Sequence, residues 1–494
     1  MIENYYSVQA EYTEQVVPEY KGLPLIEALP PILSMDDAEE ILHYYPPFEK
    51  SEKEFDDEVR KHCIERVFEY NQPWDRHIDL EQRISRMIRR SYANRFPFNP
   101  DNPLAPGHAL RINAIYEGLK HKSYESINVP ALRASGMTII GISGGGKTRS
   151  TESILGIYPP MIIHSTYNGK KFEHRQVVWI KIDCSSHGSL KALCQDFLKE
   201  YDKITGENTF NRFGDGTAET ISLQMGRIAE VCTLGLFVID EIQNLSTAKS
   251  GGQEVVLNFF DNLRNRIGVP VILIGTPKAR SILQCDFRHA RRGSGQQGDM
   301  FWSNIDKNDK DTWSLVLGGI WHYQWTKNYC ELTQNLSDAI YDESQGIIDI
   351  AIKLFAMAQV RAINTGEEII TEEIIRTIAH EQLRLVQPML DALRSGDVEK
   401  LNQFPDMQPI IWENFLAEEN RKYPQKRDQV NPLSTPIVTN NKPERTSKKK
   451  LRMSNKALDN NHIPNVVKNG INDGLDAYGS LKDAGIIVDI GKDL

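Results

Sequence analysis

Between about residues 107 and 290, short apolar runs alternate with longer segments in which apolar residues recur at helical spacing. A short uninterrupted apolar run predicts a strand buried on both faces, and helices between such strands predict a parallel sheet. The predicted strands cover residues 137–140, 177–182, 236–239 and 271–274, and the predicted helices cover residues 148–155, 189–201, 219–231 and 254–266. Because crossovers between parallel strands are right-handed, this pattern predicts a doubly wound α/β domain.

The segments on either side of this domain have other patterns. Residues 1–105 are rich in tyrosine, proline and charge, and helical spacing of apolar residues predicts a helix over residues 80–91. Prolines between residues 97 and 103 then interrupt the pattern and predict a linker or boundary. The sequence therefore predicts a separate N-terminal extension over residues 1–105, followed by the α/β domain over residues 106–292.

The C-terminal part of the chain is predicted to be helical first and disordered afterwards. Residues 293–313 are polar and contain glycine, which predicts a loop, and residues 332–392 read as helices that form a lid. After about residue 405 the composition shifts to asparagine, proline, lysine and serine, as in a disordered tail. A loop with a helical lid is thus predicted over residues 293–404 and a tail over residues 405–494, where an apolar patch at residues 484–490 is suited to docking a partner.

Composition excludes several classes of protein. The chain has 494 residues, of which 40% are hydrophobic and 25% charged, as in a globular protein of two or three domains. No apolar stretch approaches the ~20 residues that a membrane span needs, and the first residues lack the features of a secretory signal. The 6 cysteines are scattered without metal-binding spacing, which favours free thiols. We expect a cytoplasmic protein with no membrane partner.

The charge of the chain is unevenly distributed. The net charge of −9 argues against general adhesion to nucleic acid, but basic residues cluster within residues 83–95 and again within residues 442–452. The first cluster is compatible with DNA, with a partner protein, or with the solvated face of a helix. The second, in the predicted tail, is typical of segments kept soluble by charge.

A glycine-rich motif follows the first predicted strand. Residues 141–148 fit G-x-x-x-x-G-K-[ST], between a predicted strand and a predicted helix, as a phosphate-binding loop requires. Backbone N–H groups of such a loop and the helix N-terminus bind phosphate oxygens, while Lys147 reaches the phosphates and Thr148 places its hydroxyl on Mg²⁺. The alternative is a glycine-rich surface loop. The predicted nucleotide-binding residues are Gly141, Ser143, Gly144, Gly145, Gly146, Lys147, Thr148 and Arg149.

A second motif supports the first. Residues 236–239 are apolar and precede Asp240 and Glu241. In a phosphate-loop protein the aspartate holds Mg²⁺ and the glutamate orients and deprotonates the attacking water. An acidic pair of this kind favours hydrolysis over transfer to a small molecule. Residues 441–444 superficially resemble a guanine-reading motif but lie in the predicted tail, so ATP with Mg²⁺ is the expected ligand.

Two further features follow the last predicted strand. Thr276 is placed to sense the γ-phosphate; the alternative is that Thr276 caps a helix that starts at Pro277. Arg288, Arg291 and Arg292 follow, and in ring-forming ATPases an arginine from one subunit completes the site of its neighbour. We rank Arg291 and Arg292 above Arg288 for that role, against the alternatives of a solvated basic face or a DNA contact.

With these motifs in place, the chain resembles the TnsC family, the AAA+ ATPases that regulate bacterial transposons of the Tn-seven class. The matching stretches are residues 25–30, 141–148, 181–185, 188–191, 234–243, 257–260, 268–280, 290–293, 344–355, 387–396 and 485–489. Many AAA+ lids carry G-x-x-R, whereas this chain has Gly346-Ile-Ile-Asp349. Because Asp349 occupies the position of that arginine, we do not expect an arginine there to contact the γ-phosphate.

The resemblance implies an AAA+ fold and a regulatory ATPase, not a transposase. Such proteins bind ATP, assemble into rings or filaments on double-stranded DNA with little sequence preference, and join a target selector of the TnsD/TniQ type to transposase subunits of the TnsA/TnsB type. Hydrolysis then resets the assembly. The family also implies a bacterial, nucleoid-associated location, a transposase contact at the C-terminal patch and a selector contact at the N-terminal region.

The resemblance points to residues 184–191 and 213–217 for DNA binding. Lys181 and Lys191 are candidate phosphate contacts, and Ser185 and Ser186 are candidate hydrogen-bond donors. Helix capping by the serines and solvated lysines are the alternatives. Two other functions stay open: an ATPase of the replication-initiator or clamp-loader type, and a nucleotide-dependent assembly module without significant catalysis.

Overall fold

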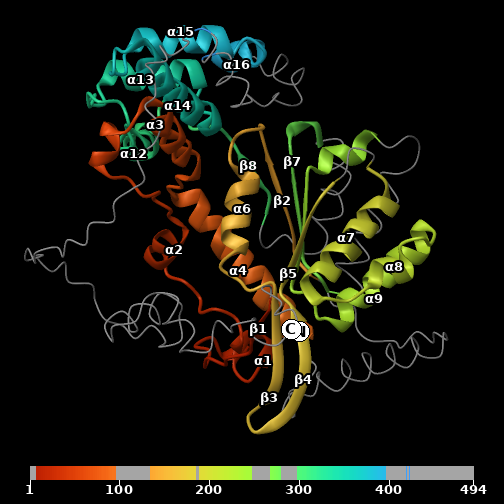
Figure 1. Ribbon diagram of the computed structural model, residues 1–494. Helices are drawn as coiled ribbons and strands as arrows, with labels where there is room; N and C mark the ends of the chain where they lie inside the picture. The colour runs from red at the N-terminus through yellow and green to blue at the C-terminus, as the bar shows by residue number, and fades with distance from the viewer. Residues whose placement is uncertain are drawn as a thin grey trace, which may run out of the picture. The chain divides into compact units, whose positions relative to one another are not determined.

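A five-stranded parallel sheet forms the centre of the protein (Figure 1). The structure is a computed structural model, and it describes residues 7–95, 134–184, 188–247, 268–279 and 298–395, together with residues 419 and 422. The strand order is β5-β6-β7-β2-β8. The strands are β2 (Gly136–Gly141), β5 (Trp179–Asp183), β6 (Leu236–Asp240), β7 (Val271–Gly275) and β8 (Met300–Trp302). The prediction of a parallel α/β sheet is confirmed.

Both faces of this sheet are covered by helices because successive side chains of each strand point in opposite directions. Met137 and Ile139 of β2 pack into one apolar core, together with α4 and α6, while Ile140 packs into a second core on the other face. Figure 1 shows α7, α8 and α9 on that second face. The helices are α4 (Asp75–Arg95), α6 (Lys147–Leu155), α7 (Leu190–Thr205), α8 (Thr209–Phe213) and α9 (Ala218–Val231).

Short polar side chains define where several of these helices begin. Ser189 accepts a hydrogen bond from the N–H of Ala192 at the start of α7, and Thr217 does the same for Thr220 at the start of α9. Such caps satisfy N–H groups that have no partner inside the helix. Helix α7 ends at Gly206, whose φ of 72° suits glycine. The helix predicted over residues 254–266 lies outside the described residues.

The predicted loop at residues 293–313 is wrong where the structure describes it. Residues 300–302 form β8, an edge strand that pairs with β2, and helix α12 (Lys310–Trp321) begins before residue 313. The short apolar triplet Met300-Phe-Trp302 is too brief to stand out as a strand in the sequence, and its pairing with β2 stabilises it in the fold. Met300 and Trp302 are buried, whereas Phe301 faces outward.

A second, three-stranded sheet was not predicted. It has the order β1-β3-β4 and consists of β1 (Ser7–Gln9), β3 (Met161–Tyr167) and β4 (Lys170–Val177). Strands β3 and β4 form a hairpin whose turn, Asn168-Gly169, has positive φ at both residues, as a two-residue hairpin turn requires. Val177, predicted as the start of the next central strand, therefore ends β4.

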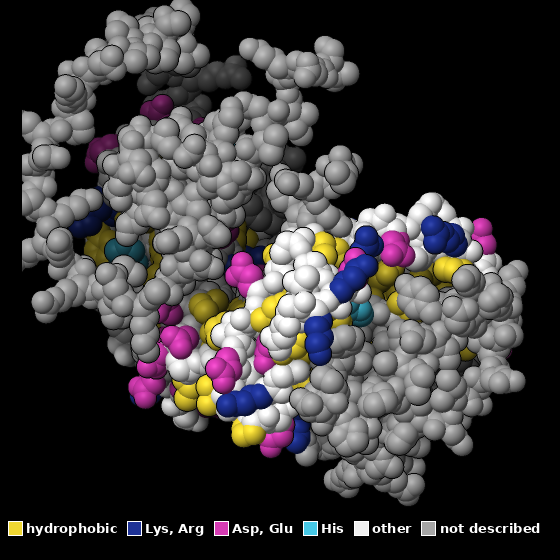
Figure 2. Space-filling view, turned by 90° about the horizontal axis from the view of Figure 1, so that it is seen from below, with side chains coloured by type: hydrophobic (Ala, Val, Ile, Leu, Met, Phe, Trp, Pro, Cys, Tyr) yellow, Lys and Arg dark blue, Asp and Glu magenta, His cyan; other side chains and the backbone are white. Residues whose placement is uncertain are grey.

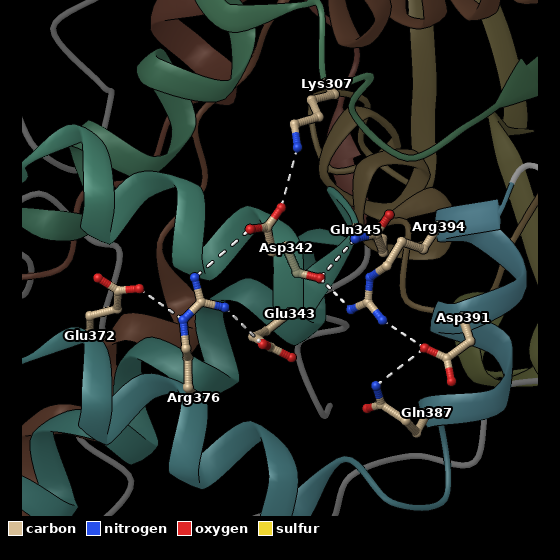
Figure 3. A network of polar contacts seen from close by, with 9 residues as sticks. All are labelled: Lys307, Asp342, Glu343, Gln345, Glu372, Arg376, Gln387, Asp391 and Arg394. Carbon is tan, nitrogen blue, oxygen red and sulfur yellow. Dashed lines mark hydrogen bonds and ion pairs between the residues drawn. The ribbon is translucent and has the colours of Figure 1, made fainter.

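The C-terminal helices form the predicted lid around the buried helix α14 (Ile348–Thr365). The other lid helices are α12, α13 (Gln334–Ser344), α15 (Glu372–Gln382) and α16 (Gln387–Ser395). Figure 3 shows how ion pairs join them: Arg376 of α15 contacts Glu372 at 2.9 Å and Glu343 of α13 at 3.2 Å. Arg394 of α16 donates to the carbonyl of Asp342 at 2.7 Å.

The N-terminal region is divided between the two cores. Helix α3 and the turn after it pack into the lid core through Cys63, Ile64 and Val67, whereas α4 packs on the sheet. Arg60, fully buried, makes a two-pronged ion pair with Glu368 of the lid, with both distances 2.7 Å. The N-terminal helical elements are η1 (Pro18–Tyr20), α1 (Pro24–Glu27), α2 (Met35–Leu42), η2 (Lys50–Glu54), α3 (Asp57–Ile64) and η3 (Glu65–Glu69).

None of the helices in the described part of the chain combines the length and the apolar character that a membrane span requires.

Candidate nucleotide-binding site

The glycine-rich segment forms a loop between β2 and α6, as predicted. Gly144 and Gly146 have φ of 75° and 88°, in the left-handed region that side chains other than glycine rarely adopt. Gly141 is required for another reason: a Cβ there would lie 1.9 Å from the carbonyl oxygen of Trp302 on β8. The glycines therefore allow both the shape of the loop and the close approach of the edge strand.

Strand β8 also contacts the loop through a side chain that the sequence analysis did not predict. The indole Nε1–H of Trp302 donates to the carbonyl of Gly145 at 2.5 Å, and the side chain is fully buried. This hydrogen bond satisfies the Gly145 carbonyl, and the N–H groups of the loop are left for a phosphate. The only signal in the sequence was the apolar triplet that ends in Trp302.

The two residues predicted to hold Mg²⁺ are brought together. Thr148 Oγ1 donates to Asp240 Oδ2 at 2.6 Å, and Asp240 Oδ1 accepts from the N–H of Glu241 at 2.7 Å. The Asp240 side chain is 2% exposed. Among the described residues, no group of three or more His, Cys, Asp or Glu is placed to hold a metal by itself. Because Mg²⁺ is usually held by few protein ligands together with phosphate oxygens and water, this hydroxyl–carboxylate pair fits it.

Lys147 lies on the phosphate loop. Its ammonium group donates to the carbonyl oxygens of Gly141 at 2.9 Å and Ile142 at 2.7 Å. The residue is 8% exposed. A triphosphate in the loop would offer this cation oxygens of higher charge than those carbonyls, so the contact is suited to exchange on binding.

A second part of the site is a hydrogen-bonded group made of Glu241, Gln243 and Thr276. Glu241 has a φ of 54°, an uncommon backbone conformation that turns the residue out of the strand. Gln243, which the sequence analysis missed, donates to Glu241 Oε2 at 2.5 Å and accepts from the N–H of Thr276 at 3.1 Å. Its amide thus links the predicted base to the predicted sensor.

Thr276 Oγ1 is buried and makes no hydrogen bond within the described residues. The alternative interpretation, in which this hydroxyl caps a helix, is therefore wrong; the described residues that follow Thr276 form the short 3₁₀ helix η6 (Pro277–Ala279). A buried hydroxyl without a partner is unfavourable unless a ligand or water supplies one. Its place in the cavity suits contact with a phosphate or a water molecule.

A cavity of about 260 Å³ lies between these residues and the lid. Its lining comprises Ser143, Gly144, Gly146, Lys147, Thr148, Arg149, Glu241, Thr276, Ile348, Asp349 and Ile352. The lid touches the loop directly, since the N–H of Asp349 donates to the carbonyl of Gly144 at 3.3 Å. The Asp349 carboxylate pairs with Lys353, one turn further along α14, at 2.8 Å. The sequence difference in the lid therefore places an ion pair, not an arginine, beside the loop.

A narrower cavity of about 50 Å³ adjoins the first and shares Gly146, Arg149, Ile348 and Ile352 with it. Its remaining walls are largely apolar and come from the lid and from the segment between η3 and α4, including Tyr70, Trp74, His77, Val316 and Ile320. Burial, with the positive charge of Arg76 as a second cause, lowers the pKa of His77 to about 3, so His77 is neutral at neutral pH.

Arg76 connects the two chain segments that pass between sheet and lid. Its guanidinium lies 4.5 Å from the ring centre of Trp74 and 4.8 Å from that of Trp302, and it donates to the carbonyl of Ser303 at 2.6 Å. Burial lowers the pKa of Arg76 to about 10, so it stays a cation at neutral pH. This stack joins the N-terminal region to the strand that supports the phosphate loop.

The remaining predicted site residues make other contacts or lie outside the described residues. Arg149 lines the cavity, but its guanidinium donates to the carbonyls of Phe68 and Glu69, so it anchors α6 to the N-terminal region. Lys181 is 10% exposed and pairs with Asp183 and Glu152, so it is not a solvated lysine. Lys191 lies half-buried in the first turn of α7. Ser185, Ser186, Arg288, Arg291 and Arg292 lie outside the described residues.

The basic cluster predicted over residues 83–95 is not a uniform surface. Arg89 is 1% exposed and donates to Ser85 and to the carbonyl of Pro30, so it serves packing. Figure 2 shows basic and acidic side chains interspersed on the described part of one face. Elsewhere along β4 and α7, surface cations are paired with acids, as in Lys171–Glu173, Arg175–Glu207 and Lys199–Asp196. DNA binding by the described residues stays a prediction.

Comparisons with known proteins give one family match and several similar solved structures. Residues 132–283 match the family described as AAA domain. None of the curated proteins matches the chain. Similar solved structures include a Walker-type ATPase of Pyrococcus abyssi (13% identity, TM-score 0.35, 64% of this chain and 88% of that chain). Another is the Aeropyrum pernix ORC2 protein in its ADP form (13% identity, TM-score 0.35, 68% of this chain and 84% of that chain). A third is Cdc6p from Pyrobaculum aerophilum (13% identity, TM-score 0.35, 66% of this chain and 88% of that chain). From its matched domain and its sheet topology, the protein has the AAA+ P-loop fold.

Proposed function

We propose that this protein binds ATP with Mg²⁺, hydrolyses it, and uses the cycle to regulate its assembly on DNA during transposition. The observation that carries the ATPase proposal is the arrangement around one cavity. The pair of Thr148 and Asp240 lies beside Lys147, and Glu241 and the unpartnered Thr276 hydroxyl line the same space. The role in transposition is supported by the sequence resemblance.

Each side chain has a distinct task in hydrolysis. Lys147 and the loop N–H groups hold the β- and γ-phosphates, and Thr148 and Asp240 hold Mg²⁺, which neutralises charge on the phosphate oxygens. Glu241 orients the attacking water and accepts its proton. The Thr276 hydroxyl donates to the γ-phosphate or to that water, which gives this buried group the partner that the described residues do not supply.

The narrow cavity is the place for the base. Apolar and aromatic side chains of the N-terminal region and the lid form much of its wall, Arg149 adds the one charged side chain among the lining residues, and the cavity adjoins the phosphate loop. A flat purine ring is bound by such surfaces through packing. The present volume of about 50 Å³ is small for a base, so we expect the lid to move when ATP enters. The proposal therefore couples nucleotide binding to the position of the lid.

The partners proposed are those of the TnsC family. They are double-stranded DNA, further copies of this chain in a ring or filament, a target selector and the transposase. In such a ring Arg291 or Arg292 of one copy would approach the triphosphate held by its neighbour. Contacts to DNA phosphates would make binding largely independent of sequence and sensitive to salt.

The variant Glu241→Gln tests the proposal, with Glu219→Gln on the exposed start of α9 as a matched control. Loss of the base should reduce ATP turnover about a hundredfold or more while ATP binding is retained. Assemblies on DNA formed with ATP should then persist, as measured by gel shift on unrelated duplexes. Unchanged turnover would leave only nucleotide-dependent assembly, and preference for one duplex sequence would contradict the proposed role on DNA.

A further inference from the structure

Lys181 occupies an unusual place beside the candidate Mg²⁺ site. Its ammonium lies 2.6 Å from Asp183 Oδ1, 3.0 Å from Glu152 Oε1 and 3.9 Å from Asp240 Oδ2. Asp240 Oδ2 is the same oxygen that accepts the hydroxyl of Thr148. A fixed cation therefore lies within ion-pair distance of the oxygen that is proposed to hold Mg²⁺.

The fold brings these groups together from three elements. Strands β5 and β6 pair in parallel with Asp183 opposite Asp240, so two carboxylates lie side by side at the carboxyl edge of the sheet. Lys181 and Asp183 are two residues apart on β5 and thus share a face of the strand, where Glu152 of α6 also reaches Lys181. Three acids consequently surround one lysine.

The charge at this position is unbalanced without the lysine. Asp183 and Glu152 are more than half exposed, but Asp240 is 2% exposed and has a second acid as its neighbour across the strands. Lys181 is held between these acids by two short ion pairs, with its side chain 10% exposed.

We propose that Lys181 is a positioning residue for Asp240 and stands in place of a second cation at the Mg²⁺ site. This inference rests on the proposed ATPase function. The ammonium keeps the neighbouring acids from drawing a divalent cation to the empty site, so that the metal enters with the triphosphate. It also holds the Asp240 carboxylate in the orientation that accepts from Thr148. Lys181 itself touches neither the phosphate loop nor the cavity lining among the described contacts.

The test uses the full-length protein and two main measurements, with DNA binding followed by gel shift alongside them. The first is binding of Mn²⁺, a spectroscopic substitute for Mg²⁺, by electron paramagnetic resonance without nucleotide. The second is steady-state ATP turnover as a function of ATP and Mg²⁺. The variant Lys181→Gln removes the charge, Lys181→Arg keeps it, and Lys199→Gln breaks a surface ion pair with Asp196 on α7 as the matched control.

For Lys181→Gln we expect Mn²⁺ to bind about tenfold more tightly without nucleotide, because a positive neighbour has been removed from an acidic site. We expect kcat to fall about tenfold while KM for ATP stays near the wild-type value, as for residues that orient a metal ligand. Lys181→Arg should restore both quantities, and Lys199→Gln should change neither. Thermal melting of each variant separates these effects from unfolding.

Three results would overturn the inference. They are wild-type Mn²⁺ affinity in Lys181→Gln, a raised KM with unchanged kcat, or weaker DNA binding with unchanged turnover. The second result would place Lys181 against the triphosphate, and the third would place it on DNA. If wild-type protein hydrolyses no ATP, the proposed function fails, and the Mn²⁺ titration without nucleotide still decides the role of Lys181.

Discussion

The hydroxyl of Thr148 donates to the carboxylate of Asp240 across 2.6 Å, although the two residues are 92 positions apart in the chain. We expect Mg²⁺ to increase the thermal stabilisation by ATP in wild-type protein. Binding at a hundred times Kd stabilises a fold by about 2.7 kcal/mol. Thr148→Val keeps the shape but loses the hydroxyl, so most of the Mg²⁺-dependent stabilisation should disappear, as it should in wild-type protein treated with a chelator. Thr148→Ser should retain it, and an equal response in Val and Ser variants would count against the site.

Gln243 offers a second test, because its amide serves both Glu241 and Thr276. Gln243→Ala leaves the buried N–H of Thr276 without this acceptor and should reduce the free energy of unfolding by about 1–3 kcal/mol in denaturant titrations. Gln243→Glu should regain part of that stability. Its new carboxylate beside Glu241 should shift the acid limb of the pH–turnover profile to higher pH. A pH–turnover profile of Gln243→Glu that is unchanged from wild type would show that residue 243 does not influence Glu241.

Gly141 tests the close approach of β8 to the phosphate loop. Gly141→Ala places a Cβ 1.9 Å from the carbonyl oxygen of Trp302, so we expect a loss of about 1–3 kcal/mol in the free energy of unfolding. Gly318→Ala is the matched control, because a Cβ at that position in α12 meets nothing within 4 Å. That control should stabilise the helix by about 0.5–1 kcal/mol. Equal effects of the two substitutions in chemical denaturation would disagree with the structure.

Trp302→Phe removes the indole N–H that binds the Gly145 carbonyl while retaining an aromatic ring. One lost hydrogen bond corresponds to about 0.5–1.5 kcal/mol, so ATP affinity measured by calorimetry should fall about two- to tenfold. Trp313→Phe is the control, since the indole of Trp313 donates to Ser337 within the lid at 3.0 Å. Its loss should lower stability without a matching change in ATP affinity. A similar loss of affinity in both variants would exclude a specific role for Trp302.

The second sheet predicts a pH dependence of stability. His164 is buried, accepts from Tyr12 at Nδ1 and donates to Gln176 from Nε2, both at 2.8 Å, and burial lowers its pKa to about 4. The unfolded chain binds a proton near pH 6.5 whereas the folded protein resists it, so stability is full above pH 6.5 and falls as the pH drops toward 4. The loss is about 3 kcal/mol for this residue. His164→Gln should flatten the pH dependence of stability only in part, because the pKa of His77 is also lowered in the folded protein. An unchanged dependence of stability on pH in this variant would contradict the assignment to His164.

The sheet and the closeness of Thr148 to Asp240 could be predicted from the sequence because both depend on local patterns. Apolar runs such as residues 236–239 specify strands that are buried on both faces, and the acids that follow them mark the carboxyl edge. The glycine loop needs its residues in a fixed order, so a short motif suffices to predict it. Helical caps such as Ser189 are equally local.

The sequence did not predict contacts between distant segments. Arg149 follows the motif but bonds to carbonyls at residues 68 and 69, and Arg89 looked basic and exposed but is buried against the carbonyl of Pro30. Strand β8 was missed because three residues carry too little periodicity. Gln243 and Trp302 were missed because neither belongs to a short motif; each acquires its role from a partner brought near by the fold.

By itself the sequence determined the parallel sheet, the phosphate loop and the acids Asp240 and Glu241, since strand burial and loop geometry are encoded by neighbouring residues. The tertiary structure decided what surrounds them. It divided the N-terminal region between sheet and lid, set Trp302 against the loop, and brought Lys181 to within 3.9 Å of Asp240. The physical reason is that burial and charge pairing act through space, so a lysine that the sequence offered as a DNA contact is paired with acids once β5 and β6 lie side by side.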